Sequence, residues 1–180
     1  MKPMVLFHNG RYALSLREGT TAISLHPASN LQIHKGYPGR QDTGENMPHI
    51  HVTCAIIERN GLVLAARRSA SMHLPLKWEF PGGKIRVGED PAQCLKREIL
   101  EELALEVDIA AEMPLSTHNY PEFIVTLYPY VCRTSSYQFS LLEHAEAAWF
   151  PPDRLAGLDW AEADLPVLNA YLSLRSEESI

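Results

Sequence analysis

One segment, residues 83–105 (GKIRVGEDPAQCLKREILEELAL), constrains the chain through the spacing of its charged residues. A helix turns by about 100° per residue, so Glu98, Glu101 and Glu102 are neighbours on one side of a helix. Three ionised carboxylates at such positions repel one another, unless hard divalent cations such as Mg²⁺ lie among their oxygens. Three clustered glutamates alone are more typical of a solvated helix face. The glycines, Glu89 and Arg97 at fixed distances favour a metal site instead.

The same segment is predicted to form an amphipathic helix. Asp90 suits the N-cap, Pro91 suits the first helical position, and Gln93 completes a capping box. An apolar stripe for the core follows at helical spacing: Ala92, Leu95, Ile99 and Leu103. Upstream, Pro81-Gly82-Gly83 predicts a loop whose backbone approaches a ligand closely. Loop, helix start and carboxylates together are typical of a site for a metal-bound diphosphate.

The segment resembles the Nudix box, G-x5-E-x7-R-E-U-x-E-E-x-G-U, in which U is a bulky aliphatic residue. Eight of the nine fixed positions match: Gly83, Glu89, Arg97, Glu98, Ile99, Glu101, Glu102 and Leu105. The second glycine of the box is Ala104 here. Because alanine adopts positive φ less easily than glycine, the exit from the helix is expected to differ. The carboxylates lie upstream and are expected to keep their geometry.

The chain is predicted to divide near residue 48. Residues 51–68 predict two strands around Asn60-Gly61, and further strands are expected near 107–111, 114–120, 122–133 and 146–150. A last helix is expected over 164–175, with Leu165, Leu168, Tyr171 and Leu172 or Leu174 facing inward. Strands interspersed with two principal helices indicate an α/β protein with a mixed sheet. The resemblance implies the Nudix fold, a mixed β-sheet between α-helices (α/β/α), and residues 49–180 are assigned to that domain.

Residues 1–48 lie outside the resemblance and are interpreted as a small, β-rich N-terminal extension. Asn9-Gly10 predicts a hairpin, AISLHP predicts a strand, and residues 35–46 are typical of a linker. We favour an appendage without chemistry, and the alternatives are that it covers the site or builds a dimer. The protein is expected to be a monomer or a homodimer.

Composition narrows the possible partners. The net charge of −6 argues against a nucleic-acid polymer, which requires a basic surface. Cys54, Cys94 and Cys132 are odd in number and lack metal-ligand spacing, so they are interpreted as reduced, mostly buried thiols of a cytoplasmic protein. The first residues are too polar for a signal peptide or membrane span, and no membrane partner is expected. His49 and His51 are interpreted as one face of a strand start.

Among Nudix families the chain is most similar to the MutT type, particularly its CTP pyrophosphohydrolase branch. The similarity lies in AARR (65–68), KWEFPGGK (77–84) and EADLPVLNAYLSL (162–174). These hydrolases use Mg²⁺, for which Mn²⁺ is a possible substitute, to cut nucleoside triphosphates into monophosphate and pyrophosphate. The resemblance implies metal ligands at Gly83, through its carbonyl, and at Glu98, Glu101, Glu102 and Glu143. For Glu143 the alternative is a surface glutamate without a role in the site. The resemblance also implies that Arg97 orients the glutamates and that Glu98 is the favoured general base. Glu89 and Gly82 are expected to support the loop, and binding a further metal is an alternative role for Glu89.

Other residues are candidates for binding the substrate. Lys84 and Arg68 resemble cations that contact the phosphates. Asp164 stands where the CTP-type branch has aspartate, and a carboxylate accepts hydrogen bonds from an exocyclic amine. It also suits a helix N-cap, which we favour as its principal role. Phe80 and Tyr120 are candidates either for walling a base pocket by stacking or for the core.

Three functions are compatible with these residues. The leading one is Mg²⁺-dependent hydrolysis of CTP-like, oxidised or otherwise damaged (deoxy)nucleoside triphosphates in nucleotide sanitation. The second is hydrolysis of ADP-ribose or another nucleoside diphosphate derivative. The third is a non-catalytic ligand sensor on the Nudix fold, which the complete set of box carboxylates disfavours.

Overall fold

The computed structural model describes residues 5–8, 12–15, 25–27 and 47–177. The chain forms two compact units, Met1–Gly44 and Glu45–Ile180. The first contains β1 (Val5–His8), β2 (Tyr12–Ser15) and β3 (Leu25–Pro27), which form an antiparallel sheet in the order β1-β2-β3. The turn at Asn9-Gly10, the start of AISLHP and the linker over 35–46 lie outside the described residues.

The second unit is built on a seven-stranded mixed sheet. Its strands are β4 (His49–Arg59), β5 (Leu62–Arg67), β6 (Trp78–Glu79), β7 (Asp108–Glu112), β8 (Ser116–Asn119), β9 (Ile124–Arg133) and β10 (Glu146–Phe150). The order is β10-β5-β4-β9-β7, while β6 pairs with β5 and β8 pairs with β9. The long central strands β4 and β9 run parallel, and the other neighbours are antiparallel.

The hairpin between β4 and β5 forms where it was predicted. Asn60 and Gly61 have φ of 46° and 79°, and two successive residues with positive φ are typical of the tight turn that joins twisted antiparallel strands.

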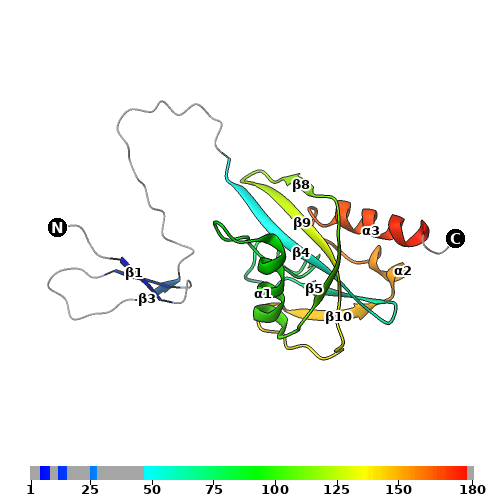
Figure 1. The fold of residues 1–180 in the computed structure, drawn as a ribbon. Coiled ribbons are helices and arrows are strands. Elements are labelled where there is room, and N and C mark those ends of the chain that lie inside the picture. The colour runs from blue at the N-terminus through cyan, green and yellow to red at the C-terminus, as the bar shows by residue number, and fades with distance from the viewer. Residues whose placement is uncertain (1–4, 9–11, 16–24, 28–46, 178–180) are drawn as a thin grey trace. The chain divides into compact units, whose positions relative to one another are not determined.

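Helices cover both faces of this sheet (Figure 1). On one face, α1 (Pro91–Leu103) packs on Ala55 and Ile57 of β4. On the other, α2 (Pro152–Leu155) and α3 (Leu165–Glu177) pack on Cys54 and Ile56. Since side chains alternate across a strand, β4 contributes buried side chains to the core on both faces of the sheet. This arrangement confirms the predicted α/β/α sandwich.

Helix α1 begins as predicted, because the Asp90 side chain accepts a hydrogen bond from the Gln93 amide at 3.1 Å. Three stripe residues are fully buried: Leu95, Ile99 and Leu103. Ala104 ends the helix with φ 50° and ψ 37°, and its amide donates to the Leu100 carbonyl. The expectation of a different exit was therefore wrong. The alanine adopts the left-handed conformation, and the next residue, Leu105, is buried in the core.

Helix α3 buries a face different in part from the predicted one. Val167, Leu168 and Tyr171 are buried, whereas Leu165 and Leu174 are 42% and 47% exposed. The inward placement of Leu165 was wrong, because it lies two residues, about 200° around the helix, before Val167. Of the two alternatives, Leu172 is the one that packs against the core.

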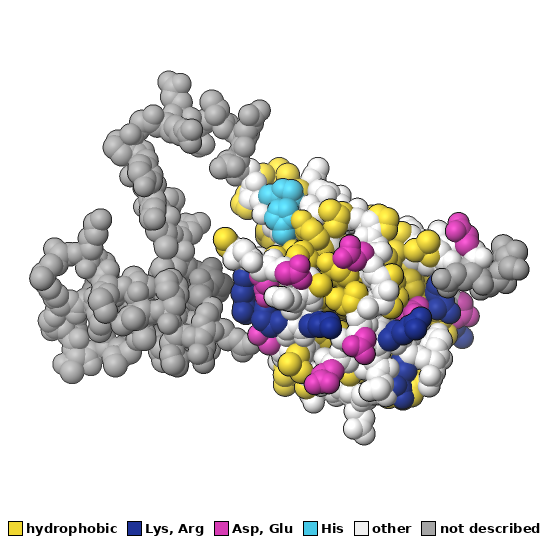
Figure 2. All heavy atoms as spheres, in the orientation of Figure 1, with side chains coloured by type: hydrophobic (Ala, Val, Ile, Leu, Met, Phe, Trp, Pro, Cys, Tyr) yellow, Lys and Arg dark blue, Asp and Glu magenta, His cyan; other side chains and the backbone are white. Residues whose placement is uncertain are grey.

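The structure also describes the three cysteines, the histidine pair at the start of β4 and the charged surface. Cys54, Cys94 and Cys132 are free and buried. His49 and His51 stack at the start of β4, with ring centroids 4.6 Å apart. No helix among the described residues is long and apolar enough to cross a membrane. On the face in Figure 2, basic and acidic side chains are interspersed and do not gather into one basic area.

Candidate active site

A cavity of about 600 Å³ brings together residues from α1, β4, β9 and several loops. Nine of the predicted site residues line it: Arg68, Gly82, Gly83, Lys84, Glu98, Glu102, Tyr120, Glu143 and Asp164. Four others do not: Phe80, Glu89, Arg97 and Glu101. The remaining wall is largely apolar, from Ile50, Val52, Phe123, Val125 and Leu127.

Arg97 connects the loop to the helix carboxylates. Its Nε and Nη2 donate to the two oxygens of Glu89 at 2.7 and 2.9 Å. Its Nη1 donates to Glu98 at 2.5 Å and to Glu101 at 3.3 Å. Glu89 also accepts from the Arg86 amide at 2.9 Å. The hydrogen bonds from Arg97, then that from Arg86, lower the pKa of Glu89 from its ordinary value to about 2, so an ionised Glu89 supports both loop and arginine.

The two loop glycines permit close packing on two sides. A Cβ on Gly83 would lie 2.3 Å from Cδ of Glu98, so the bare backbone leaves room for that carboxylate. A Cβ on Gly82 would lie 2.0 Å from the carbonyl oxygen of Thr53. The loop is thereby pressed between strand β4 and helix α1.

The Gly83 carbonyl faces β4. It accepts hydrogen bonds from the Thr53 amide at 2.9 Å and the Thr53 hydroxyl at 3.3 Å. A carbonyl oxygen has two lone pairs, and both are used here. The assignment of this carbonyl as a metal ligand was therefore wrong for this conformation.

Gly82 is a better candidate for that ligand. Pro81 and Gly83 both direct their carbonyls to β4, where the Ala55 and Thr53 amides donate to them. Successive carbonyls alternate in extended chain, so the Gly82 carbonyl points the other way. The Gly82 amide offsets part of the rise in the pKa of Glu102, which places this amide near the Glu102 carboxylate. Sequence reasoning assigned Gly82 to the loop alone, although this alternation could have indicated the carbonyl.

Glu102 provides the test of whether the site suits a cation. The residue is 7% exposed, and its Oε2 is buried with no hydrogen-bond partner among the described residues. Burial, followed by the charges of Glu79, Glu98 and Glu143, raises its pKa from the ordinary value to about 8. A buried oxygen without a donor, among other carboxylates, fits a hard divalent cation.

The side chains of the box carboxylates do not surround a common metal position in this structure. Among the described residues no three acidic, histidine or cysteine side chains already surround one point. The reason is Arg97, whose Nη1 holds Glu98 and Glu101. The Glu101 side chain is 50% exposed and also lies 3.7 Å from Arg86. A cation shared by all of these carboxylates would therefore require Glu101 to leave Arg97 and turn towards Glu102.

Sequence reasoning missed Glu79, which lines the cavity, and His144, which contacts Glu79. Nε2 of His144 lies 2.9 Å from Oε1 of Glu79, and Oε2 of Glu79 accepts from Nη1 of Arg68. Arg68 also donates from Nε to the His73 carbonyl at 2.6 Å. Glu79 is the leading charge that raises the pKa of Glu102 and of Asp164. The strand alternation that buries Trp78 places Glu79 on the opposite face, and this was the available signal.

The cavity is also lined by Asp164, which is 6% exposed. Its Oδ1 accepts from the Phe80 amide at 3.0 Å, and its backbone carbonyl accepts from Leu168 at the start of α3. The cap as the principal role of this side chain was wrong, because the carboxylate ties β6 to α3 instead. Burial, then the charge of Glu79, raises the pKa of Asp164 to about 8.

Of the two aromatic candidates for the base pocket, Phe80 lies in the core and Tyr120 lines the cavity. Phe80 is 2% exposed and packs on Trp160 with ring centroids 4.6 Å apart. Its assignment to the pocket wall was wrong, since only its backbone reaches Asp164. Tyr120 lines the cavity, in ring contact with His73 at 5.7 Å and Phe123 at 5.0 Å.

Comparisons with known proteins agree with this geometry. Residues 47–171 match the NUDIX domain model. The chain is 32% identical over 130 residues to the CTP pyrophosphohydrolase of Escherichia coli, covering 72% of this chain and 96% of that protein. It is 33% identical over 79 residues to the 8-oxo-dGTP diphosphatase of Proteus vulgaris, covering 43% of this chain and 70% of that protein. The solution structure of the E. coli ORF135 protein superimposes with a TM-score of 0.63 at 32% identity, covering 73% of this chain and 94% of that one. The chain therefore belongs to the Nudix family and is a Nudix hydrolase.

Proposed function

We propose that the protein hydrolyses (deoxy)nucleoside triphosphates, either CTP-like or oxidised, to a nucleoside monophosphate and pyrophosphate. One observation carries the proposal: a single cavity is lined both by the box carboxylates Glu98 and Glu102 and by the buried Asp164. A triphosphate with its phosphates at the carboxylates would place its base beside Asp164. The named activities of the relatives, on CTP and on 8-oxo-dGTP, support the same substrate class.

Glu98, Glu102 and Glu143, with the Gly82 carbonyl, are the proposed ligands of Mg²⁺ or Mn²⁺. Glu101 joins them from the rim when its contact with Arg97 opens. When bound, the metal supplies charge stabilisation for the phosphate oxygens and lowers the pKa of water. The orphaned Oε2 of Glu102 is the acceptor that such a cation satisfies.

Glu98 is the proposed general base. Its Oε1 accepts from Arg97 at 2.5 Å, so the arginine fixes the direction in which the carboxylate points. Gly83 packs directly on its side chain and limits where the carboxylate points. Arg97 and Glu89 position this group.

Lys84 is the proposed contact for the substrate phosphates. It lines the cavity and makes no ion pair among the described residues, so its charge is available. Arg68 is already paired with Glu79, and its role is to hold that carboxylate in place beside the substrate. Tyr120 and Asp164 contact the base.

Hydrolysis in ¹⁸O-labelled water, with the products resolved by phosphorus NMR, tests the proposal. In this reaction water attacks the β-phosphorus, the bond from that phosphorus to the nucleoside monophosphate breaks, and the label enters pyrophosphate. Label in the monophosphate would instead indicate attack at the α-phosphorus, as expected for diphosphate derivatives such as ADP-ribose. Release of inorganic phosphate as the first product, or binding without turnover across a nucleotide panel, would contradict the proposal.

A further inference from the structure

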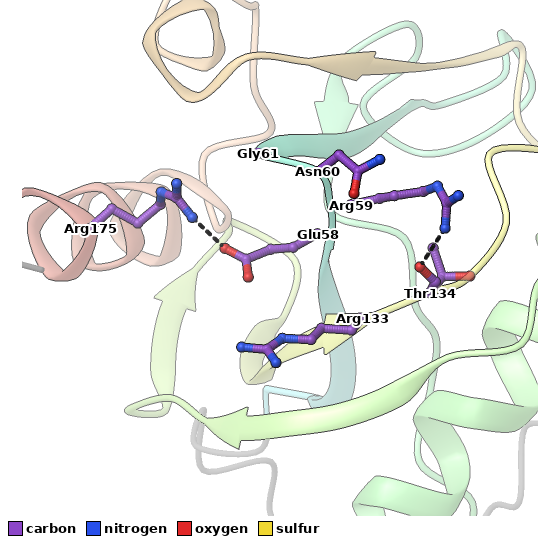
Figure 3. Close-up of a pocket in the computed structure, with 7 residues that line it drawn as sticks. All are labelled: Glu58, Arg59, Asn60, Gly61, Arg133, Thr134 and Arg175. Atoms are coloured by element: carbon purple, nitrogen blue, oxygen red, sulfur yellow. Dashed lines mark hydrogen bonds and ion pairs between the residues drawn. The ribbon is translucent and has the colours of Figure 1, made fainter. Parts of the chain in front are cut away.

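A second cavity, of about 310 Å³, lies at the tip of the β4–β5 hairpin (Figure 3). Its lining consists of Glu58, Arg59, Asn60, Gly61, Arg133, Thr134 and Arg175. On β4 the candidate active site involves residues 50 and 52, whereas this cavity begins at residue 58. Six residues of strand span roughly 20 Å, so the two cavities are separate sites.

This cavity, here named the arginine pocket, carries a local positive charge in an acidic chain. Three of its lining residues are arginines and one is a glutamate. The carboxylate of Glu58 is already satisfied, because it accepts from the Tyr171 hydroxyl at 2.6 Å and from Arg175 at 2.9 Å. Glu58 and Arg175 offset each other, and two guanidinium charges remain.

Arg59 is held in place with a donor unused. Its Nη1 donates to the Thr134 carbonyl at 3.1 Å, and its guanidinium lies over the Tyr137 ring, 4.2 Å from the centroid. Its Nε is buried and has no hydrogen-bond partner among the described residues. A buried donor without an acceptor costs free energy, which an anion in the pocket would recover.

Arg133 provides the second charge. It extends from β9 beneath Glu58 (Figure 3) and makes no ion pair or hydrogen bond among the described residues. Its cross-strand neighbour on β7 is Asp108, and the two side chains do not form an ion pair. Arg59 and Arg133 therefore come from parallel, adjacent strands with their charges available to one ligand.

We propose that the arginine pocket binds a small phosphate-bearing anion. Guanidinium forks match phosphate oxygens with two parallel hydrogen bonds, and two uncompensated charges match a dianionic phosphate group. The volume suits inorganic phosphate, pyrophosphate or one mononucleotide, and the chemistry common to these ligands is a terminal phosphate. This site is independent of the function proposed above.

NMR titration of the full-length, ¹⁵N-labelled protein in EDTA tests the proposal, since chelation removes metal-dependent binding at the carboxylates. The probes are inorganic phosphate, inorganic pyrophosphate and CMP, each compared with sodium chloride at equal ionic strength. We expect saturable shifts of the Arg59 and Arg133 Nε–H signals and of the amides of residues 58–61. Arg133→Gln should weaken binding about tenfold, the effect of one lost charge-assisted contact.

Arg154→Gln is the matched control. Arg154 is exposed on α2, so this substitution removes the same charge from a position outside the pocket. It should bind like the wild type. Tightest binding of pyrophosphate identifies an inorganic ligand, and tightest binding of CMP identifies a nucleotide. Absence of saturable shifts in the wild type, equal shifts with chloride, or equal weakening by both variants would overturn the proposal. If Arg133→Gln lowers the melting temperature, Arg133→Lys keeps the charge without the fork and should still bind more weakly.

Discussion

Glu89 and Arg97 form a two-point ion pair in which both carboxylate oxygens and two guanidinium nitrogens take part, at 2.7 and 2.9 Å. The pair leaves Nη1 of Arg97 for Glu98. Glu89 lies in the loop before α1, and Glu98 lies on the helix itself. The loop therefore sets the position of a helix carboxylate through one arginine, which explains the long fixed spacing between these residues.

Glu89→Gln should remove the charged half of this pair and lower turnover about tenfold or more, because Arg97 then positions Glu98 less well. The variant should also change acid stability. The pKa of Glu89 is lowered to about 2, so its contribution is present above the unfolded-state value near 4.5 and is lost as pH falls towards 2. Melting temperatures of both proteins should converge over that window. A constant difference in melting temperature between the two proteins from pH 7 to pH 2 would contradict the ion pair between Glu89 and Arg97.

Glu102→Gln should stabilise the metal-free protein and inactivate the enzyme. Because the folded-state pKa is raised to about 8, the folded protein retains a proton that the unfolded chain loses above about pH 4.5. Wild-type stability therefore falls as pH rises from about 4.5 to 8, and the glutamine variant should escape this fall. Turnover with Mg²⁺ should drop by roughly 10² or more. Thermal melts in EDTA across pH, with turnover assays, measure both effects, and unchanged turnover would remove Glu102 from the site.

Gly83→Ala and Gly82→Ala separate two kinds of close contact. The added Cβ at Gly83 meets the Glu98 side chain, which is able to turn away, so the fold should survive while kcat falls. The Cβ at Gly82 meets the Thr53 backbone, which lies in the central strand, so this variant should lose stability as well. Melting temperature and kcat measured together distinguish the two. Equal loss of stability in both variants would contradict this difference.

Asp164→Asn should change the order of preference among CTP, dCTP and 8-oxo-dGTP. The carboxyl lines the cavity, is largely buried and accepts from the Phe80 amide. An asparagine oxygen keeps that hydrogen bond, so the fold should survive while the group presented to a base changes from a carboxyl to an amide. Values of kcat/KM across the panel measure the effect. An unchanged order would make Asp164 a structural link between β6 and α3 alone.

Ala104→Gly should stabilise the protein by about 0.5 to 1 kcal/mol without changing turnover. Ala104 has a left-handed conformation at the helix end, which costs alanine about 1–2 kcal/mol, while glycine loses more entropy on folding. Denaturant unfolding measures the difference. Ala92→Gly, on the partly buried stripe of the same helix, is the control and should destabilise. Lower stability of Ala104→Gly than of the wild type would show that the strain is absent.

Local patterns in the sequence determined the helix start and the tight turn, whose formation depends only on residues close by in the chain. Asp90, Pro91 and Gln93 were sufficient to predict the start of α1, and Asn60-Gly61 was sufficient for the hairpin, because caps and tight turns depend on residues within one or two turns of chain. The box spacing determined that Glu89, Arg97 and Glu98 act together, since the intervening loop and helix have lengths that the sequence specifies.

Only the tertiary structure decided what each of these elements faces. Phe80 proved to be core and Asp164 a link to its amide, because the residue before α3 meets the residue after β6, 84 positions earlier in the sequence. Glu79 and His144, 65 positions apart, meet because β6 and the loop before β10 both approach β5, and no periodicity connects them. The Gly82 carbonyl is expected to point away from β4, because the carbonyls on either side of it pair with that strand. Direction and contact across the sheet depend on long-range packing, which local spacing does not encode.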